Sequence, residues 1–237
     1  MLDEKQKPQR NDMPKRLDKS VRAVIQNATR LLEDAQFLEF SKPPISAWFL
    51  ALIAQEELAK AFILCLTNRR TIPWNPHILR ALQDHKCKQL VCLVMDYLAP
   101  DIDEFIIRCN VVAIKKELPI MPRRVADALN ILRYEKIGRW VSQTWVWAEE
   151  PDYDHDALAI AKGKKDRLKQ DALYVRLGKD GSVASTPMNH GATALADEMD
   201  RAERFRRLVE NLLEGAEHPR QDWDLIDEAF RLLFTDD

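Results

Sequence analysis

Residues 45–68, ISAWFLALIAQEELAKAFILCLTN, form a long apolar stretch with a short polar group near its middle. A helix of this composition is apolar on nearly every side, which is typical of a helix surrounded by other helices in a bundle. Glu56, Glu57 and Lys60 stand near its centre, and each such charge costs about 2.5 to 3.5 kcal/mol in the middle of a membrane-spanning helix. We therefore expect the central helix of a protein and not a membrane span.

The segments on either side of this stretch predict helices that pack against it. Residues 15–40 carry apolar side chains at three- and four-residue steps, and a proline pair at residues 43–44 follows, so this helix is expected to pack antiparallel to residues 45–68. Residues 75–98 begin with an Asn-Pro pair, in which the asparagine caps a helix and the proline suits its first turn. Similar patterns predict further helices at residues 102–117, 122–140, 154–170, 192–213 and 223–234.

Residues 173–185 depart from the helical pattern. Strand-favouring side chains flank a turn that contains Asp180 and Gly181, which predicts a β-hairpin. The predicted fold class is therefore all-α, an antiparallel helical bundle with additional helices and one small β-hairpin near residues 173–185. Residues 1–19 are charged and contain no signal segment, so we expect a flexible N-terminal arm there and a single domain over residues 20–237.

Composition limits the classes of function. The formal net charge of -2 requires neither a nucleic acid nor a membrane as partner on bulk electrostatics. The four cysteines lack CxxC spacing, which indicates reduced thiols and a cytoplasmic protein. The six glycines form neither a GxGxxG nor a P-loop pattern, and the five histidines form no HExxH or zinc-like cluster. We expect no nucleotide cofactor, no metal and, without a GxSxG motif, no serine hydrolase of that kind.

Glu56 and Lys60 stand out as charges within the apolar stretch. They are four residues apart with the acidic residue first, so they lie on one helical face in the orientation that favours an ion pair. Since apolar side chains continue that face, we expect the pair to be partly buried. One interpretation is a buried structural salt bridge, and the other is that both residues support a catalytic site.

Arg80 and His85, in the third predicted helix, form a candidate catalytic pair. A neutral imidazole can take the proton of a ribose 2′-OH while a guanidinium holds the phosphate, so the pair suits RNA cleavage without a metal ion. Five residues turn a regular helix by about 140°, so the side chains can converge only at a distorted turn or across two subunits. The competing interpretation is a boundary histidine and a solvated arginine.

Arg70 and His77 repeat the pattern across a turn, but His77 falls in the first helical turn, where a solvent-facing role is favoured.

Basic side chains gather at two places in the chain. Both groups could follow an RNA backbone. The alternative, which we favour, is solvated helix surface, because acidic residues lie among the first group and flank the second. The groups are Lys115, Lys116, Arg123, Arg124 and Arg133, and then Lys162, Lys164, Lys165, Arg167 and Lys169.

Three motifs, taken together, resemble the AbiV family of bacterial abortive-infection proteins, a branch of the HEPN superfamily. The resemblance extends over most of the chain and implies an all-helical HEPN-like bundle with a family-specific hairpin, a role in phage defence, and dimerisation. The motifs are Glu56-Glu57-Leu58-Ala59-Lys60 in the apolar stretch, His85-Lys86-Cys87-Lys88 in the third predicted helix, and Lys169-Gln170 ahead of Leu173-Tyr174-Val175 with its turn and Pro187.

The resemblance also implies roles for individual residues. HEPN proteins are often metal-independent endoribonucleases whose arginine and histidine are separated by four to six residues, and Arg80 with His85 fits this gap. His85 would then be the base and Arg80 would hold the phosphate. The supporting residues would be Glu56 and Lys60, and the residues in contact with RNA would be Lys86, Lys88 and Glu57. In a dimer, two copies of the third predicted helix would combine these side chains in a shared site.

Two hypotheses follow for the function. In the first, the protein is a homodimeric HEPN ribonuclease of the AbiV type that acts on RNA in phage defence. In the second, it keeps the same bundle but cleaves nothing, and senses or sequesters a phage or host protein. Ala81 follows the arginine where catalytic members commonly carry a polar residue, which favours the second hypothesis. Neither involves a membrane partner.

Overall fold

The computed structural model describes residues 13–38, 40, 44–115, 121–141, 151–187, 191–215 and 220–232. In this part of the chain the regular structure is helical apart from one two-stranded antiparallel sheet. The predicted all-α fold class with one small hairpin is confirmed.

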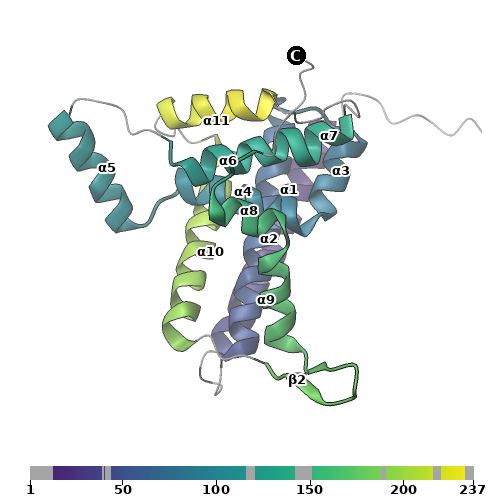
Figure 1. Ribbon diagram of the computed structural model, residues 1–237. Coiled ribbons are helices and arrows are strands. Elements are labelled where there is room, and N and C mark those ends of the chain that lie inside the picture. Colours follow the sequence, from purple (N-terminus) through teal and green to yellow (C-terminus); the bar gives the residue numbers. More distant parts are fainter. Residues whose placement is uncertain are drawn as a thin grey trace, which may run out of the picture.

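Helix α2 (Ile45–Asn68) is the centre of the bundle. Figure 1 shows α2 with long helices running beside it, and it packs against α1 (Met13–Leu38), α4 (His85–Leu98), α9 (Lys164–Leu173) and α10 (Gly191–Glu214). Side chains such as Leu58 and Phe62 are completely buried, and each contributes about 1.5 to 3 kcal/mol to the free energy of folding. The expected central helix is confirmed. Of the helices that the structure describes, none combines the length with the apolarity that a bilayer span requires.

The third predicted helix is two helices in the structure, which corrects the expectation of one helix over residues 75–98. α3 (Pro76–Gln83) ends and α4 begins at Asp84, whose backbone is extended (φ -77°, ψ 115°). The Asp84 carboxylate accepts a hydrogen bond from the Cys87 N–H at 3.0 Å and so caps α4. Asn75 caps α3 in the same way, as predicted. Because of the break, His85 becomes the first residue of a new helix.

Two other predicted helices are also interrupted. Residues 122–140 form α6 (Arg123–Ile131), a π-helical turn η2 (Leu132–Lys136) and α7 (Ile137–Val141). Residues 154–170 form α8 (His155–Ala161) and α9, which continues to Leu173. Gly163 separates α8 from α9 with a φ of 79°, a left-handed conformation that glycine adopts without the steric cost of a Cβ. Beyond this turn α9 packs against α2.

The predicted hairpin is present, with strands shorter than the segment 173–185. β1 (Arg176–Leu177) pairs antiparallel with β2 (Val183–Ser185). The Gly178 N–H donates to the Ser182 carbonyl at 2.7 Å across the turn. Figure 1 shows the hairpin at the far end of α9, beyond the bundle.

The remaining helices agree with the predictions, with small differences at their ends. α5 (Ile102–Lys115) stands apart from the bundle in Figure 1, and α11 (Arg220–Leu232) lies across one end of it. α1 begins at Met13, so residues 13–19 of the expected arm are helical. The rest of the arm, residues 1–12, lies outside the described residues, as do Lys116 and the predicted helix ends at 116–117 and 233–234.

A small core cluster fixes α9 against α2 near the hairpin. It includes Trp48 and Leu52 of α2, Ala172 of α9 and Leu195 of α10, all of which are buried. Close packing of this kind leaves little freedom for one helix to slide along another. The cluster therefore holds the polar residues of α9 at a defined position beside α2.

We expect the Asp84 cap to contribute to stability. Asp84→Ala leaves the Cys87 N–H without its side-chain acceptor, and loss of such a cap lowers the free energy of unfolding by about 0.5 to 2 kcal/mol. Asp84→Asn keeps an acceptor oxygen and should remain close to the wild type. Urea denaturation of the three proteins measures this, and equal midpoints for Asp84→Ala and the wild type would contradict a capping role.

Candidate functional site

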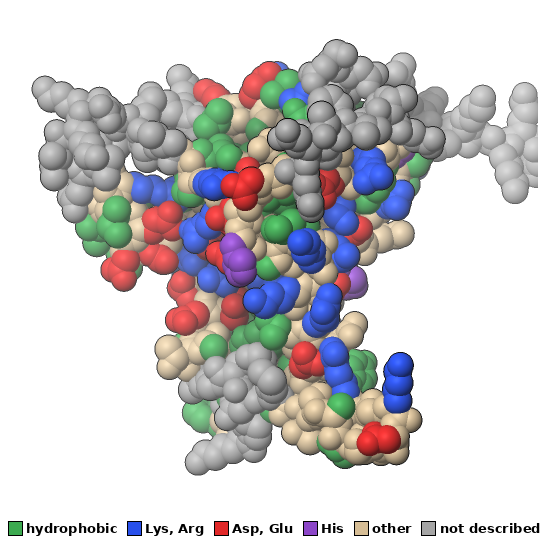
Figure 2. Space-filling model, in the orientation of Figure 1, with side chains coloured by type: hydrophobic (Ala, Val, Ile, Leu, Met, Phe, Trp, Pro, Cys, Tyr) green, Lys and Arg blue, Asp and Glu red, His purple; other side chains and the backbone are tan. Residues whose placement is uncertain are grey.

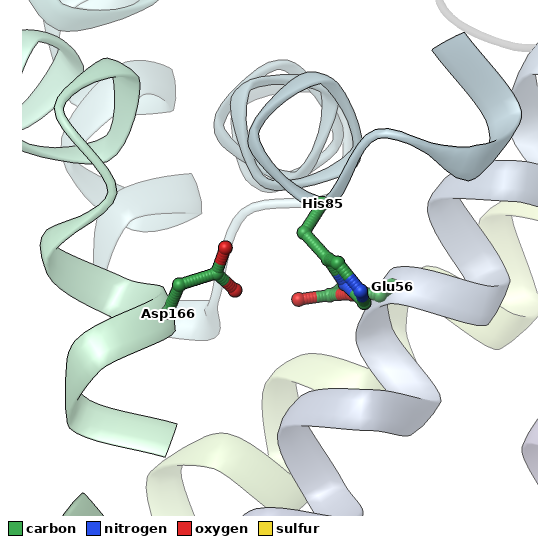
Figure 3. A group of neighbouring side chains, drawn as sticks. All are labelled: Glu56, His85 and Asp166. Atoms are coloured by element: carbon green, nitrogen blue, oxygen red, sulfur yellow. The ribbon is translucent and has the colours of Figure 1, made fainter. Parts of the chain in front are cut away.

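Glu56 places a carboxylate inside the bundle. It lies on α2, and only 4% of its side chain is exposed. Figure 3 shows the side chains of Glu56, His85 and Asp166 approaching one another from α2, α4 and α9. A charge removed from water in this way is costly unless nearby groups pair with it. Four side chains from α4 and α9 supply these contacts.

His85 contacts Glu56 and also reaches solvent. Its Nδ1 lies 2.5 Å from Glu56 Oε2, while 53% of its side chain is exposed. Because an ionised carboxylate only accepts hydrogen bonds, Nδ1 donates its proton to Glu56, and Nε2 is the unprotonated nitrogen of the neutral ring. The imidazole is therefore anchored through one nitrogen and can accept a proton at the other.

Two buried lysines balance the negative charge. Lys169 donates to Glu56 Oε1 and forms an ion pair with Asp166 Oδ1 at 2.8 Å. Lys88 Nζ lies 3.4 Å from Glu56 Oε2, and only 7% of each lysine side chain is exposed. Gln89 completes the network, since its Nε2 donates to Glu56 Oε1 at 2.7 Å and to Asp166 Oδ1 at 3.2 Å. We call the six residues Glu56, His85, Lys88, Gln89, Asp166 and Lys169 the Glu56 network.

The electrostatics of the network keep Glu56 ionised. Burial alone would raise the pKa of Glu56, because it disfavours the charged form. The hydrogen bond and positive charge of Lys169, with the hydrogen bonds from Gln89 and His85, outweigh burial and hold the pKa of Glu56 below its ordinary value of 4.5. At neutral pH the carboxylate is therefore present to hold the imidazole.

Glu56, His85 and Asp166 also have the spacing of a metal site, since one ligand atom from each lies within 4.8 Å of the others. Lys169, however, already contacts both carboxylates. A divalent cation between them would have to displace this ammonium group or meet its repulsion. The arrangement therefore suits proton transfer better than metal binding.

His85 opens onto a hollow of about 390 Å³ between α2 and α9. The residues that line the hollow are of two kinds, polar groups that include members of the Glu56 network and apolar or aromatic groups. The polar ones are His85, Asp166, Lys169 and Gln170, and the others are Phe49, Ile53, Leu173 and Tyr174. The hollow gives the imidazole access to a bound molecule.

Lys60 pairs with Glu57 and not with Glu56, which corrects the predicted ion pair. Glu57 also accepts a hydrogen bond from Asn27 of α1 at 3.2 Å. The reason is competition, because donors from α4 and α9 already occupy both oxygens of Glu56. Glu57 and Lys60 form a separate pair facing α1, and no contact among the described residues joins Lys60 to His85.

Arg80 lies away from the hollow, on the exposed side of α3. Its guanidinium stacks over the Trp140 ring of α7, 4.1 Å from the ring centroid, and it is not among the described residues that line the hollow of His85. The break at Asp84 is a distorted turn of the kind that convergence requires, but it directs His85 to Glu56. Within the described part of one chain, the predicted base and the predicted phosphate-binding arginine face different surroundings.

The residues predicted to contact RNA differ in their exposure. Lys88 is buried in the Glu56 network, so it can reach a phosphate only by leaving Glu56. Lys86 is half-buried and lies close to Gly163, where an added Cβ would stand 3.1 Å from its Cε. The side chain of Glu57 is 15% exposed. Contact of these residues with RNA stays a prediction.

Three residues of the network were not predicted as site residues. Gln89 follows His85 by four positions, so its place on the same face of α4 could have been read from helical spacing. Asp166 and Lys169 lie in a basic segment whose composition favours solvated helix surface. Lys169 is instead buried, because α9 packs onto α2 through contacts more than one hundred residues apart in the chain.

Comparison with known proteins identifies one family. A sequence model of the AbiV family matches residues 16–207, which include every member of the Glu56 network. No curated protein and no solved structure matches the chain.

The network predicts unequal effects for two adjacent carboxylates. Glu56→Gln removes the negative charge from two buried lysines, and breaking a buried pair in this way lowers the free energy of unfolding by about 3 to 5 kcal/mol. Glu57→Gln disrupts a more exposed pair and should cost about 1 kcal/mol or less. Denaturant unfolding of both variants measures the difference, and equal losses would contradict the assignment of Glu56 as the buried centre.

The lowered pKa of Glu56 also predicts how this difference depends on pH. A carboxylate whose pKa is lower in the folded state stabilises the fold above its unfolded pKa, and this stability is lost as the pH falls through the folded value. The stability gap between the wild type and Glu56→Gln should therefore be full at neutral pH and shrink once the pH drops below the ordinary value of 4.5. Unfolding measured across this range tests it, and a gap that widens at acidic pH would have the wrong sign.

Proposed function

We propose that this protein acts in phage defence, because the chain belongs to the AbiV family of HEPN abortive-infection proteins. We further propose that it cleaves RNA without a metal ion and acts as a homodimer. The observation that supports cleavage best is the hydrogen bond between His85 Nδ1 and the buried Glu56 carboxylate. It fixes the tautomer in which Nε2 accepts a proton, and the partly exposed ring borders a hollow. A histidine held in this way is suited to general base catalysis.

The proposed reaction begins with proton transfer to His85. Nε2 takes the proton of a ribose 2′-OH, and the 2′-oxygen attacks the adjacent phosphorus. The bond from phosphorus to the 5′-oxygen breaks, and this oxygen takes up a proton from the imidazolium or from water. The products are a 2′,3′-cyclic phosphate and a 5′-hydroxyl, and no oxidant, reductant or metal is required.

The negative charge that develops on the phosphate during cleavage must be stabilised by a cation. A second copy of the chain could supply this cation, which supports the proposed dimer. Lys169 borders the hollow but is already paired with Glu56 and Asp166. Arg80 is exposed on α3 and does not line the hollow of its own chain. In the proposed homodimer, Arg80 of one copy serves the His85 of the other, and its planar guanidinium binds two phosphate oxygens.

A basic surface near the site supports RNA as the substrate. Lys162, Lys164 and Arg167 are exposed on the turn before α9 and on α9 itself. Figure 2 shows Lys and Arg side chains gathered on the face formed by α8 and α9. Such groups bind a phosphate backbone without reading its sequence.

The second hypothesis, a protein that binds a phage or host partner and cleaves nothing, is favoured by the contact of Arg80 with Trp140. In this case the Glu56 network is a buried structural ion cluster. The two functions differ in what His85 must do. Phage protection that survives His85→Ala would favour the binding protein.

Cleavage should depend on His85 and not on another exposed histidine. We expect wild-type protein in chelator to release 2′,3′-cyclic phosphate ends from RNA, and His85→Ala to lower the rate by about 10² to 10⁴-fold through loss of the base. His155→Ala is the matched control, because His155 is exposed on α8 and lies outside the Glu56 network. Denaturing gels and end-group analysis measure the products, and equal rates for His85→Ala and the wild type would contradict the proposal.

A mixing experiment tests the shared site. Arg80→Ala and His85→Ala should each be inactive alone, but a mixed dimer contains one site with both Arg80 and His85. An equal mixture, allowed to exchange subunits, should recover about a quarter of wild-type activity, since half of the dimers are mixed and each has one of two sites intact. No recovery, despite mixed dimers detected by mass spectrometry, would contradict a site built from two chains.

A further inference from the structure

The hollow that His85 borders is also lined by four apolar or aromatic side chains, which the proposed reaction does not use. Phe49 and Ile53, one turn apart on α2, are half-buried. Leu173 and Tyr174, at the end of α9, are 37% and 62% exposed. Exposed apolar side chains that gather beside a polar group are typical of a binding surface.

The backbone of Tyr174 is fixed at the end of α9, and its side chain lines the same hollow as His85. Tyr174 ends α9 with an extended backbone (φ -116°, ψ 139°), and its N–H donates to the Gln170 carbonyl at 2.9 Å. Five residues earlier, on the same helix, Lys169 is bound to Glu56. The helix that carries the aromatic ring is thus tied to the carboxylate that orients the imidazole.

The two kinds of lining residue match the two parts of a nucleotide. The ribose and phosphate carry polar oxygens, which suit His85 and Lys169, whereas a base presents a flat π-face, which suits Tyr174 and Phe49. The volume of about 390 Å³ is sufficient for a small ligand. A tyrosine exposed to this degree is also available for stacking.

From this geometry we infer that the hollow is a base-binding subsite, in which Tyr174 stacks on an unpaired nucleobase beside the cleaved phosphate, and that the substrate is single-stranded RNA. The inference rests on the proposed ribonuclease function. A base within a duplex is stacked and paired, so it cannot enter the hollow unless it is first extruded. Stacking uses a face that all four bases share, so the subsite selects unpaired strands with little preference for sequence.

Binding of an RNA that cannot be cut tests the subsite separately from catalysis. The probe is a fluorescein-labelled single-stranded RNA with a 2′-O-methyl group on every ribose, and its affinity for the full chain is measured by fluorescence anisotropy. We expect Tyr174→Ala to weaken binding by about 5- to 150-fold, the range for loss of one stacked base, and Tyr174→Phe to stay within about twofold of the wild type. Val175→Ala is the matched control, because Val175 is 54% exposed and is not among the described residues that line the hollow.

Three results would overturn the subsite. They are wild-type affinity in Tyr174→Ala, wild-type affinity in Tyr174→Leu, and equal affinity of the wild type for duplex and single-stranded forms of the probe. Tyr174→Leu keeps the apolar bulk without the π-face, so it covers the case in which the alanine variant does not fold. With cleavable RNA, Tyr174→Ala should raise KM and leave kcat close to that of the wild type. A wild type that binds the probe through Tyr174 but cuts no RNA would contradict the ribonuclease and not the subsite, so the two failures are distinguishable.

Discussion

The buried carboxylate of Glu56 ties three helices of the bundle together. A helix as apolar as α2 can enclose a charge at its centre only if its neighbours bring donors to it. α4 supplies His85, Lys88 and Gln89, and α9 supplies Lys169. The positions of both helices are therefore set by a polar requirement as well as by the apolar core around them.

Two interruptions between helices, at Asp84 and at Gly163, position the members of the Glu56 network. Asp84 ends α3 and caps α4, which places His85 in the first turn, where one side of its ring meets Glu56 and the other meets solvent. Gly163 ends α8 in a left-handed conformation, and α9 then packs against α2. The same network that satisfies a buried charge thus leaves an oriented imidazole at the surface. Together with membership of the AbiV family, this geometry is the basis of the proposed acid–base chemistry on RNA.

Sequence patterns predicted the fold well, because helical periodicity, caps and turn residues act over a few residues. The apolar stretch around Glu56, the Asn75 cap and the Asp180-Gly181 turn were all read in this way. The break at Asp84 was missed because apolar spacing continues through it, although an aspartate three residues before Cys87 is a recognised cap signal. At α9, the periodicity did not show the turn at Gly163.

The candidate site was predicted only in part, because tertiary packing decides which charged side chains pair with one another. Glu56 and His85 were identified, but Glu56 was assigned to Lys60, which is near in sequence, and not to Lys169, which is near in space. Helical spacing places Lys60 within reach of the carboxylates of both Glu56 and Glu57, and it does not decide which of them Lys60 contacts. Arg80 and His85 were paired by spacing alone, whereas the structure places Arg80 against Trp140.

The hydrogen bond from His85 Nδ1 to Glu56 can be tested in solution by locating the proton of the neutral imidazole. Nitrogen-15 NMR of histidine-labelled protein at a pH where the ring is neutral distinguishes a nitrogen that carries a proton from one that does not. If Glu56 holds the ring, the spectrum should show a protonated Nδ1 and an unprotonated Nε2 for His85, and this preference should be lost in Glu56→Ala, which removes the acceptor oxygens. A proton on Nε2 in the wild type would rule out the base role of His85, because Nε2 would then be unable to accept a proton from a substrate.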